Sequence, residues 1–185
     1  MVERVKRGAL YDDVIEAPDD KIAEIVHGDL YLSPRPGPRH TNASSLLGAE
    51  LVEAFHRGRR GPGGWWILDE PELHLGFDIL VPDIAGFRRD RMPELPASAW
   101  FEIAPDWLCE VISASTERLD RDKKLPIYAR AGVEHLWIVD PTVKTLEVLR
   151  RVAGEWRTIA RHSGQVTISE PPFEAVAIEL GPLWS

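Results

Sequence analysis

The chain has 185 residues, of which 44% are hydrophobic and 28% are charged, and its formal net charge is −8. Such a composition is typical of a globular protein and excludes a disordered chain, which would combine low hydrophobicity with high charge. The length predicts one domain over residues 1–185, and the negative charge argues against a broad basic surface for nucleic acid.

The cysteine content and the N-terminal sequence bear on the compartment. Cys109 is the one cysteine, which excludes an intrachain disulfide framework and a cysteine-rich zinc site and fits a reducing compartment. Charges run through residues 1–18, so no signal peptide is predicted there. No apolar stretch reaches the ~18 residues of a membrane span. We therefore expect a cytoplasmic protein without a membrane segment.

The first half of the chain predicts a β-hairpin, a helix and two further strands. Residues 22–33 form two short strands around a Gly-containing turn. Residues 40–56 have apolar positions at helical spacing and predict a helix. A strand starts at Trp65–Leu68 and runs toward Leu73–Leu75, and the next lies within Asp78–Phe87.

A β-α-β unit follows. Trp107–Ile112 is a short apolar run that predicts a buried strand, and His135–Val139 predicts another. Between them, residues 117–131 predict a helix that ends at Gly132. Two strands joined by one helix are expected to be parallel.

The remaining C-terminal elements are predicted to be β-structure. Thr145–Arg150 and Trp156–Ala160 flank a Gly-containing turn, and residues 173–180 alternate like a half-buried strand. The whole chain thus predicts an α/β fold: a core of helix, three strands, helix and strand around a mixed sheet, with an N-terminal hairpin and a C-terminal β extension.

Two carboxylates in this pattern are candidate metal ligands. Glu110 lies inside an apolar strand, where a carboxylate must be paired, protonated or bound to a cation. Asp83 follows Val81-Pro82 and would otherwise be an ordinary turn residue. At the ends of neighbouring strands, the two side chains are predicted to share a hard cation such as Mg²⁺ or Mn²⁺.

A lysine is predicted to serve this site. Lys124, Ile127, Tyr128 and Ala131 fall on one stripe of the predicted helix, which points inward. Lys124 is therefore the inward lysine and Lys123 is turned aside. An ammonium at this place would stabilise charge that develops on a phosphate; a lysine whose stem covers the helix surface is the alternative.

Three arginine-rich segments leave two interpretations open. The segments are Arg57-Gly58-Arg59-Arg60, Arg88-Arg89-Asp90-Arg91 and Arg150-Arg151. Each is either a local phosphate-binding patch or a solvated loop.

Residues 105–141 contain a series of spaced motifs. In chain order these are Glu110-Val111-Ile112-Ser113-Ala114-Ser115, Asp120, Lys124, Tyr128, Gly132-Val133 and Trp137-Ile138-Val139-Asp140-Pro141. Together they resemble the Uma-two family of restriction endonucleases. Upstream, Pro82-Asp83, Glu24 with Gly28, and His40 at the start of the first long helix also match, so the resemblance covers about residues 22–156.

This resemblance implies a PD-(D/E)xK nuclease fold and Mg²⁺-dependent cleavage of DNA, with Asp83 as the Asp and Glu110 as the (D/E) residue. Ile112 stands where the superfamily normally has its lysine, and Lys124 on the following helix takes that role. Glu24, His40 and Asp120 are possible auxiliary residues. Pro126 interrupts the helix just after Lys124 and makes the aim of that side chain depend on where the helix starts.

Three functions follow as hypotheses. The first is a metal-dependent endonuclease, expected as a homodimer because two strands of a duplex need two active sites. The second is a non-catalytic DNA-binding or assembly protein on the same fold, since a fold does not fix a function. The third is a metal-dependent hydrolase of a smaller phosphate ester.

Overall fold

A computed structural model describes all of residues 1–185, and its largest element is a mixed six-stranded sheet. The strand order is β11-β10-β9-β8-β7-β4, and only the central pair β8–β9 is parallel. In chain order these strands are β4 (Trp65–Asp69), β7 (Ile84–Arg88), β8 (Trp107–Val111), β9 (His135–Asp140), β10 (Thr145–Val152) and β11 (Glu155–Ser163).

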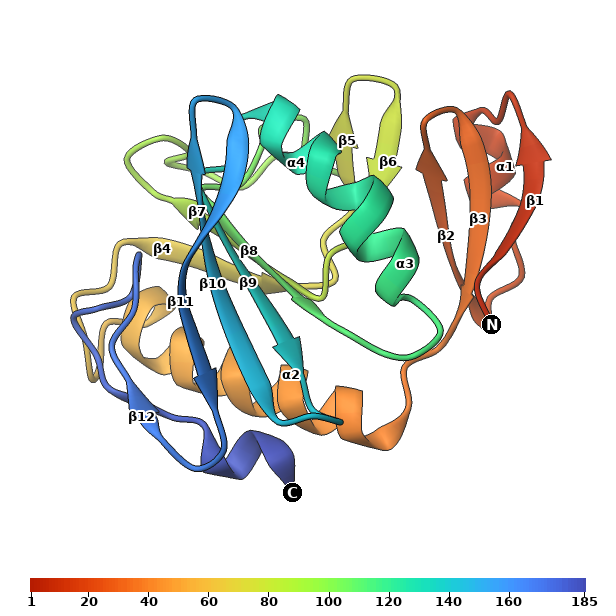
Figure 1. Ribbon diagram of the computed structural model, residues 1–185. Helices are drawn as coiled ribbons and strands as arrows, with labels where there is room; N and C mark the ends of the chain where they lie inside the picture. The colour runs from red at the N-terminus through yellow and green to blue at the C-terminus, as the bar shows by residue number, and fades with distance from the viewer.

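A second, five-stranded sheet lies beside the first; in Figure 1 its strands β1, β2 and β3 are on the right, and β5 and β6 are at the top. Its order is β1-β3-β2-β6-β5, and β2 joins β6 through a single pair, Ile25 with Ile79. The strands are β1 (Glu3–Arg7), β2 (Lys21–Val26), β3 (Asp29–Pro34), β5 (Leu73–Leu75) and β6 (Asp78–Leu80), with the short helix α1 (Tyr11–Ile15) after β1.

Two helical segments cover the two faces of the large sheet (Figure 1). One face packs against α2 (Pro38–Leu51) and its π-helical continuation η1 (Val52–His56). The other packs against a continuous run of α3 (Glu117–Leu119), the π-helical turn η2 (Asp120–Lys124) and α4 (Leu125–Ala131). No helix has the length and apolar character that a membrane crossing would require.

The alternation of side chains along β8 separates the two cores. Trp107, Cys109 and Val111 belong to the α2 side, where Trp137 and Phe173 pack edge-on against Trp107. Leu108 and Ile112 belong to the α3–α4 side. Glu110 shares the latter face, as the period of two along a strand predicts.

The predicted core order is confirmed. In chain order, the elements that build the large sheet and cover its faces are α2, then β4, β7 and β8, then the α3–α4 segment, then β9. Strand β9 is parallel to β8. The N-terminal hairpin is also present as β2 and β3, and the 145–160 hairpin as β10 and β11.

The two strands predicted upstream of residue 88 are wrong in their extent. Residues 65–75 and 78–87 were each expected to lie in one strand, but each is divided between the sheets. Glu70, with a φ of 44°, and Pro71 turn the chain after β4, and Val81–Asp83 carries it from β6 to β7. Asp83 was predicted at the end of a strand, and it instead directly precedes the start of β7 at Ile84.

The predicted strand over residues 173–180 is also wrong, because only Ile178–Glu179 (β13) pairs, with Thr167–Ile168 (β12). Phe173 is fully buried against Trp107 and Trp137, and turns at both sides of it replace extended backbone. A short 3-10 helix, η3 (Gly181–Trp184), ends the chain.

Candidate active site between the two sheets

Glu110 occupies the centre of the candidate site. It lies near the end of β8, and only 2% of its surface is exposed. Tyr128 donates its hydroxyl to Oε1 of Glu110 at 2.7 Å, and Lys124 Nζ lies 3.0 Å from the same oxygen. Both contacts fall on Oε1, so no protein donor binds Oε2. The buried carboxylate is thus paired, as its apolar strand requires, and keeps one oxygen for a ligand.

Lys124 extends from the π-helical turn η2 into a set of carboxylates. Its Nζ lies 2.9 Å from Oε1 of Glu24, 3.0 Å from Glu110 and 3.4 Å from Oδ1 of Asp120. Burial disfavours the ammonium, but the charges of Glu110 and Glu24 outweigh it and raise the pKa of Lys124 well above its usual range. Lys124 is therefore a fixed positive charge, and Lys123 points away to the hydroxyl of Tyr31, as predicted.

The geometry resolves the question that Pro126 raised. The helical run starts at Glu117, so Pro126 lies inside it, two residues after Lys124 at the end of η2. The turn before it is π-helical, a local widening that is frequent at functional sites. The helical run therefore stays continuous, and Lys124 keeps its inward aim.

Asp83 reaches the site from the crossing between the sheets. Ile84 pairs with Cys109 in the antiparallel register of β7 and β8, so Asp83 stands next to Glu110 on the neighbouring strand. Its Oδ2 accepts the backbone N–H of Val111 at 2.7 Å. Its Oδ1 lies 3.0 Å from Nε2 of His40, near the start of α2. Burial alone would lower the pKa of His40, but the hydrogen bond to Asp83 raises it above its usual value.

Glu24 links the small sheet to the site. It lies on β2, is 3% exposed, and accepts the N–H of Val81 at 2.8 Å through the oxygen that contacts Lys124. The position of Lys124 therefore depends on both sheets. All six predicted residues line one cleft of about 100 Å³, namely Glu24, His40, Asp83, Glu110, Asp120 and Lys124.

The cleft holds more carboxylates than cations. Burial raises the pKa of Glu110 well above its usual range; Asp120, Asp83 and Glu24 add to the rise and Lys124 opposes it. Burial, together with the charge of Glu24, also raises the pKa of Asp120 to about 6, against the charge of Lys124. Burial and the neighbouring carboxylates both disfavour the ionised forms of Glu110 and Asp120, and a hard divalent cation bound in the cleft would offset both effects.

The donor set suits a cation held partly by water. No group of three or more His, Cys, Asp and Glu side chains is arranged to hold a metal ion. Two carboxylates with several waters are the usual protein contribution to a Mg²⁺ site, and the cleft has room for several waters. Asp83 and Glu110 are the residues that fit such an ion.

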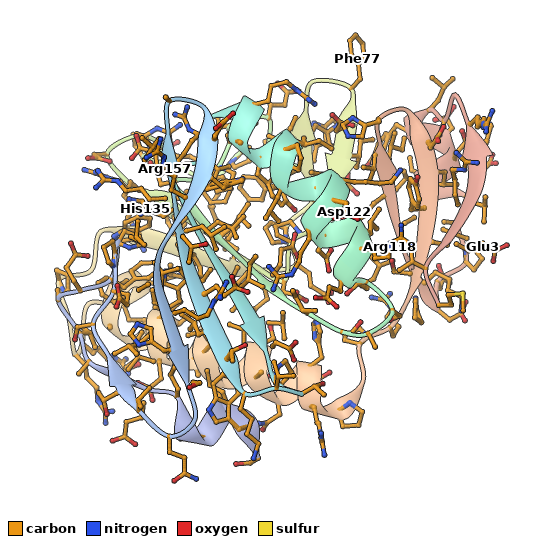
Figure 2. The ribbon with its side chains drawn as sticks, viewed as in Figure 1. Glu3, Phe77, Arg118, Asp122, His135 and Arg157 are labelled. Carbon is orange, nitrogen blue, oxygen red and sulfur yellow. The ribbon has the colours of Figure 1, made fainter.

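One functional candidate was missed at the sequence level. Tyr128 was placed on the inward stripe with Lys124 but was not assigned to the site. Its signal was its position four residues after Lys124, which brings both side chains to one face of the helix. Figure 2 shows the α3–α4 segment, which carries both, packed over the strands of the large sheet.

Comparisons with known proteins identify the family and the fold of the chain. A family model described as "Uma2: Putative restriction endonuclease" matches residues 9–181. The chain is also similar to a crystal structure titled as a putative nuclease belonging to DUF820 from Anabaena variabilis ATCC 29413, with 21% identity, a TM-score of 0.72, and coverage of 94% of this chain and 96% of that chain. No curated protein matches the chain. The structural likeness confirms a restriction endonuclease-like fold.

Proposed function

The chain belongs to the Uma2 (Uma-two) family, and from this premise we propose that it is a metal-dependent endonuclease that hydrolyses phosphodiester bonds of DNA. The observation that carries the proposal is that Asp83, Glu110 and Lys124 line one cleft although they come from separate elements. The family description and the nuclease-like fold support the same class of reaction.

Each side chain has a role in this proposal. Asp83 and Glu110 are the residues that would hold Mg²⁺ or Mn²⁺. The bound ion would supply a Lewis acid that offsets negative charge on the phosphate. Lys124 places a permanent ammonium beside the reacting phosphate and stabilises the charge that develops there.

The auxiliary residues act by positioning. Glu24 and Asp120 fix the direction of the Lys124 ammonium through their contacts at 2.9 and 3.4 Å. His40 orients Asp83 through the contact at 3.0 Å between Nε2 and Oδ1. Because Glu24 comes from the small sheet and Glu110 from the large one, we propose that residues 1–185 act as one domain.

The biological setting is part of the proposal. Cleavage of both strands of a duplex requires two such clefts, so the active form is a homodimer. A reducing, cytoplasmic compartment fits the single buried thiol of Cys109.

A plasmid-nicking assay tests the function. Supercoiled DNA is incubated with the protein and Mg²⁺ or Mn²⁺, and we expect nicked and linear products that disappear with EDTA. Glu110→Gln and Lys124→Ala should each reduce the rate by about 10²-fold or more. Lys123→Ala is the matched control, since Lys123 contacts Tyr31 outside the cleft.

The other outcomes separate the alternative functions. Cleavage that persists in both cleft variants would contradict this site. Turnover of a small phosphodiester without any action on plasmid would identify a hydrolase of smaller esters. DNA binding without cleavage under any metal condition would identify a non-catalytic protein on the nuclease fold.

A further inference from the structure

Three basic side chains form a row across the large sheet. His135 on β9 stands directly opposite Arg150 on β10, and Arg150 stands directly opposite Arg157 on β11. Residues opposite each other in a sheet share a face. The alternation of β9, in which Trp137 packs on the α2 side, gives His135 that same face. Figure 2 labels His135 and Arg157 at the same end of the large sheet.

A hollow of about 620 Å³ opens at this row. It lies where β7 ends and β9 begins, at the end of the sheet away from Glu110 and on its other face. Its lining includes Arg88, Arg89, Arg150 and His135, with loops around residues 62–65 and 171–174. Two of the three arginine-rich segments of the sequence therefore meet at one place, which their separation in the chain did not reveal.

Most of this positive charge has no protein partner. Arg150 and Arg157 have no carboxylate within 4.0 Å, whereas Arg88 pairs with Asp90 at 2.6 Å. Arg89 donates to the carbonyls of Trp65 and His56 and lies over the Trp66 ring, so its guanidinium is held in place without being neutralised.

Two further features of the hollow bear on its ligand. Glu174 is the remaining carboxylate of the lining, and it is exposed. Nδ1 of His135 is buried without a hydrogen-bond partner.

The basic side chains of this row repel one another. Like charges directly opposite each other destabilise an antiparallel pair, and an anion bound between them would remove this repulsion. Neighbouring strands are about 4.8 Å apart, so the row spans roughly 10 Å. Charges along one nucleic-acid strand are about 3.4 Å apart along the helix axis, so a row of this length reaches more than one phosphate and fits a strand better than one small anion.

We propose that the hollow at Arg88, His135 and Arg150, together with the neighbouring Arg157, is a second contact site for the phosphate backbone of nucleic acid. It is separate from the catalytic cleft and adds affinity without base recognition. The choice of nucleic acid as the source of the phosphates rests on the proposed function. The site explains how a chain of net charge −8 binds a polyanion: the cations are concentrated at one end of the sheet.

The test measures binding and needs no cleavage. The full chain is titrated into a fluorescein-labelled duplex in EDTA, and anisotropy is followed over a range of salt concentrations. In Arg150→Gln/Arg157→Gln we expect affinity about tenfold or more below wild type at low salt. The slope of log affinity against log salt should fall by about two, close to one for each phosphate that the variant no longer neutralises.

Matched variants keep the result interpretable. Arg4→Gln/Arg7→Gln removes two exposed arginines from β1 and should leave affinity within about twofold of wild type. Arg150→Lys/Arg157→Lys keeps both charges and should retain the wild-type slope. Circular dichroism melts establish that each variant is folded.

Several outcomes would overturn the proposal. These are absence of binding by wild type, an unchanged slope in Arg150→Gln/Arg157→Gln, or equal reductions of affinity in the β1 control. Displacement of the duplex by inorganic phosphate at constant ionic strength, in wild type only, would identify a small-anion site instead. If wild type cleaves plasmid but Arg150→Gln/Arg157→Gln keeps the wild-type salt slope, this second site is refuted and the proposed function is not. If binding depends on Arg150 and Arg157 but no DNA is cleaved, the proposed function is refuted and the site is not.

Discussion

Tyr128 and Glu110 form a hydrogen bond of 2.7 Å between two buried residues, each at most 2% exposed. Both groups are buried, so the hydroxyl of Tyr128 and the ammonium of Lys124 are the protein partners of Oε1 of Glu110, and they hold the carboxyl group toward the cleft.

Removal of that hydroxyl should destabilise the protein. Tyr128→Phe leaves the packing in place but deprives a buried carboxylate of one donor, so we expect the free energy of unfolding to fall by about 1–3 kcal/mol. Urea denaturation followed by tryptophan fluorescence measures the decrease. Tyr31→Phe is the control, since Tyr31 accepts from the partly exposed Lys123, and an equal decrease in both variants would contradict a special role for the buried pair.

Replacement of Lys124 should have a larger effect. Lys124→Met leaves Glu24, Glu110 and Asp120 without their shared cation, and breaking a buried ion pair in this way costs about 3–5 kcal/mol. The variant should recover stability as the pH falls, because protonation removes the mutual repulsion of the carboxylates. Denaturation at neutral and acidic pH measures both effects. A variant as stable as Lys123→Met at neutral pH would refute this account.

Local sequence patterns predicted the part of the site that one strand and one helix build. The period of two along Trp107–Ile112 placed Glu110 on the face of Leu108, and the helical stripe separated Lys124 from Lys123. Both inferences depend on the geometry of a single element, which the spacing of residues determines.

The contribution of the small sheet was not predictable in the same way. Glu24 and Lys124 are distant in sequence, and their contact depends on how β2 and β6 pair through Ile25 and Ile79. A contact between sheets leaves no periodic signal within either segment. The division of residues 78–87 between sheets was hidden for the same reason, since apolar residues lie on both sides of Val81–Asp83.

Asp120 should make stability fall as the pH rises through 6. Its pKa is about 6 in the folded protein and about 3.9 in an unfolded chain. A raised pKa means that the folded state holds this proton more tightly than the unfolded state. The contribution of this proton to the stability of the protein is therefore complete below about pH 4 and is lost as the pH passes about 6.

The measurement is the difference in unfolding free energy between wild type and Asp120→Asn from about pH 4 to 7. We expect the difference to change by up to roughly 3 kcal/mol, with the variant gaining relative to wild type at the higher pH. Asp122→Asn, an exposed position on the same turn, should show no such change. A parallel pH dependence for wild type and Asp120→Asn would contradict the burial argument.

Glu147 should act in the opposite direction. Arg121 and Arg161 contact its two oxygens at 2.6 and 2.9 Å. Burial alone would raise the pKa of Glu147, but these two hydrogen bonds lower it below its usual value. Its stabilising effect is therefore present above the unfolded pKa and is lost as the pH falls through the folded value. Glu147→Gln should lower the free energy of unfolding by about 1 kcal/mol near neutral pH and should be as stable as wild type in acid. Thermal melts over this pH range measure the difference. A loss of stability that persists in acid would exclude the ion pairs as its cause.

Divalent metal should stabilise the protein through Asp83. A ligand that binds only the folded state at about 100 times its Kd adds about 2.7 kcal/mol, which corresponds to an increase in Tm of roughly 5–10 °C for a chain of this size. We expect this shift with Mn²⁺ in wild type and its disappearance in Asp83→Asn, because the amide cannot supply a second anionic ligand beside Glu110. Asp122→Asn removes the same charge outside the cleft and should retain the shift. If Mn²⁺ raises the Tm of Asp83→Asn as much as that of wild type, the ion binds elsewhere and the pairing of Asp83 with Glu110 has another purpose.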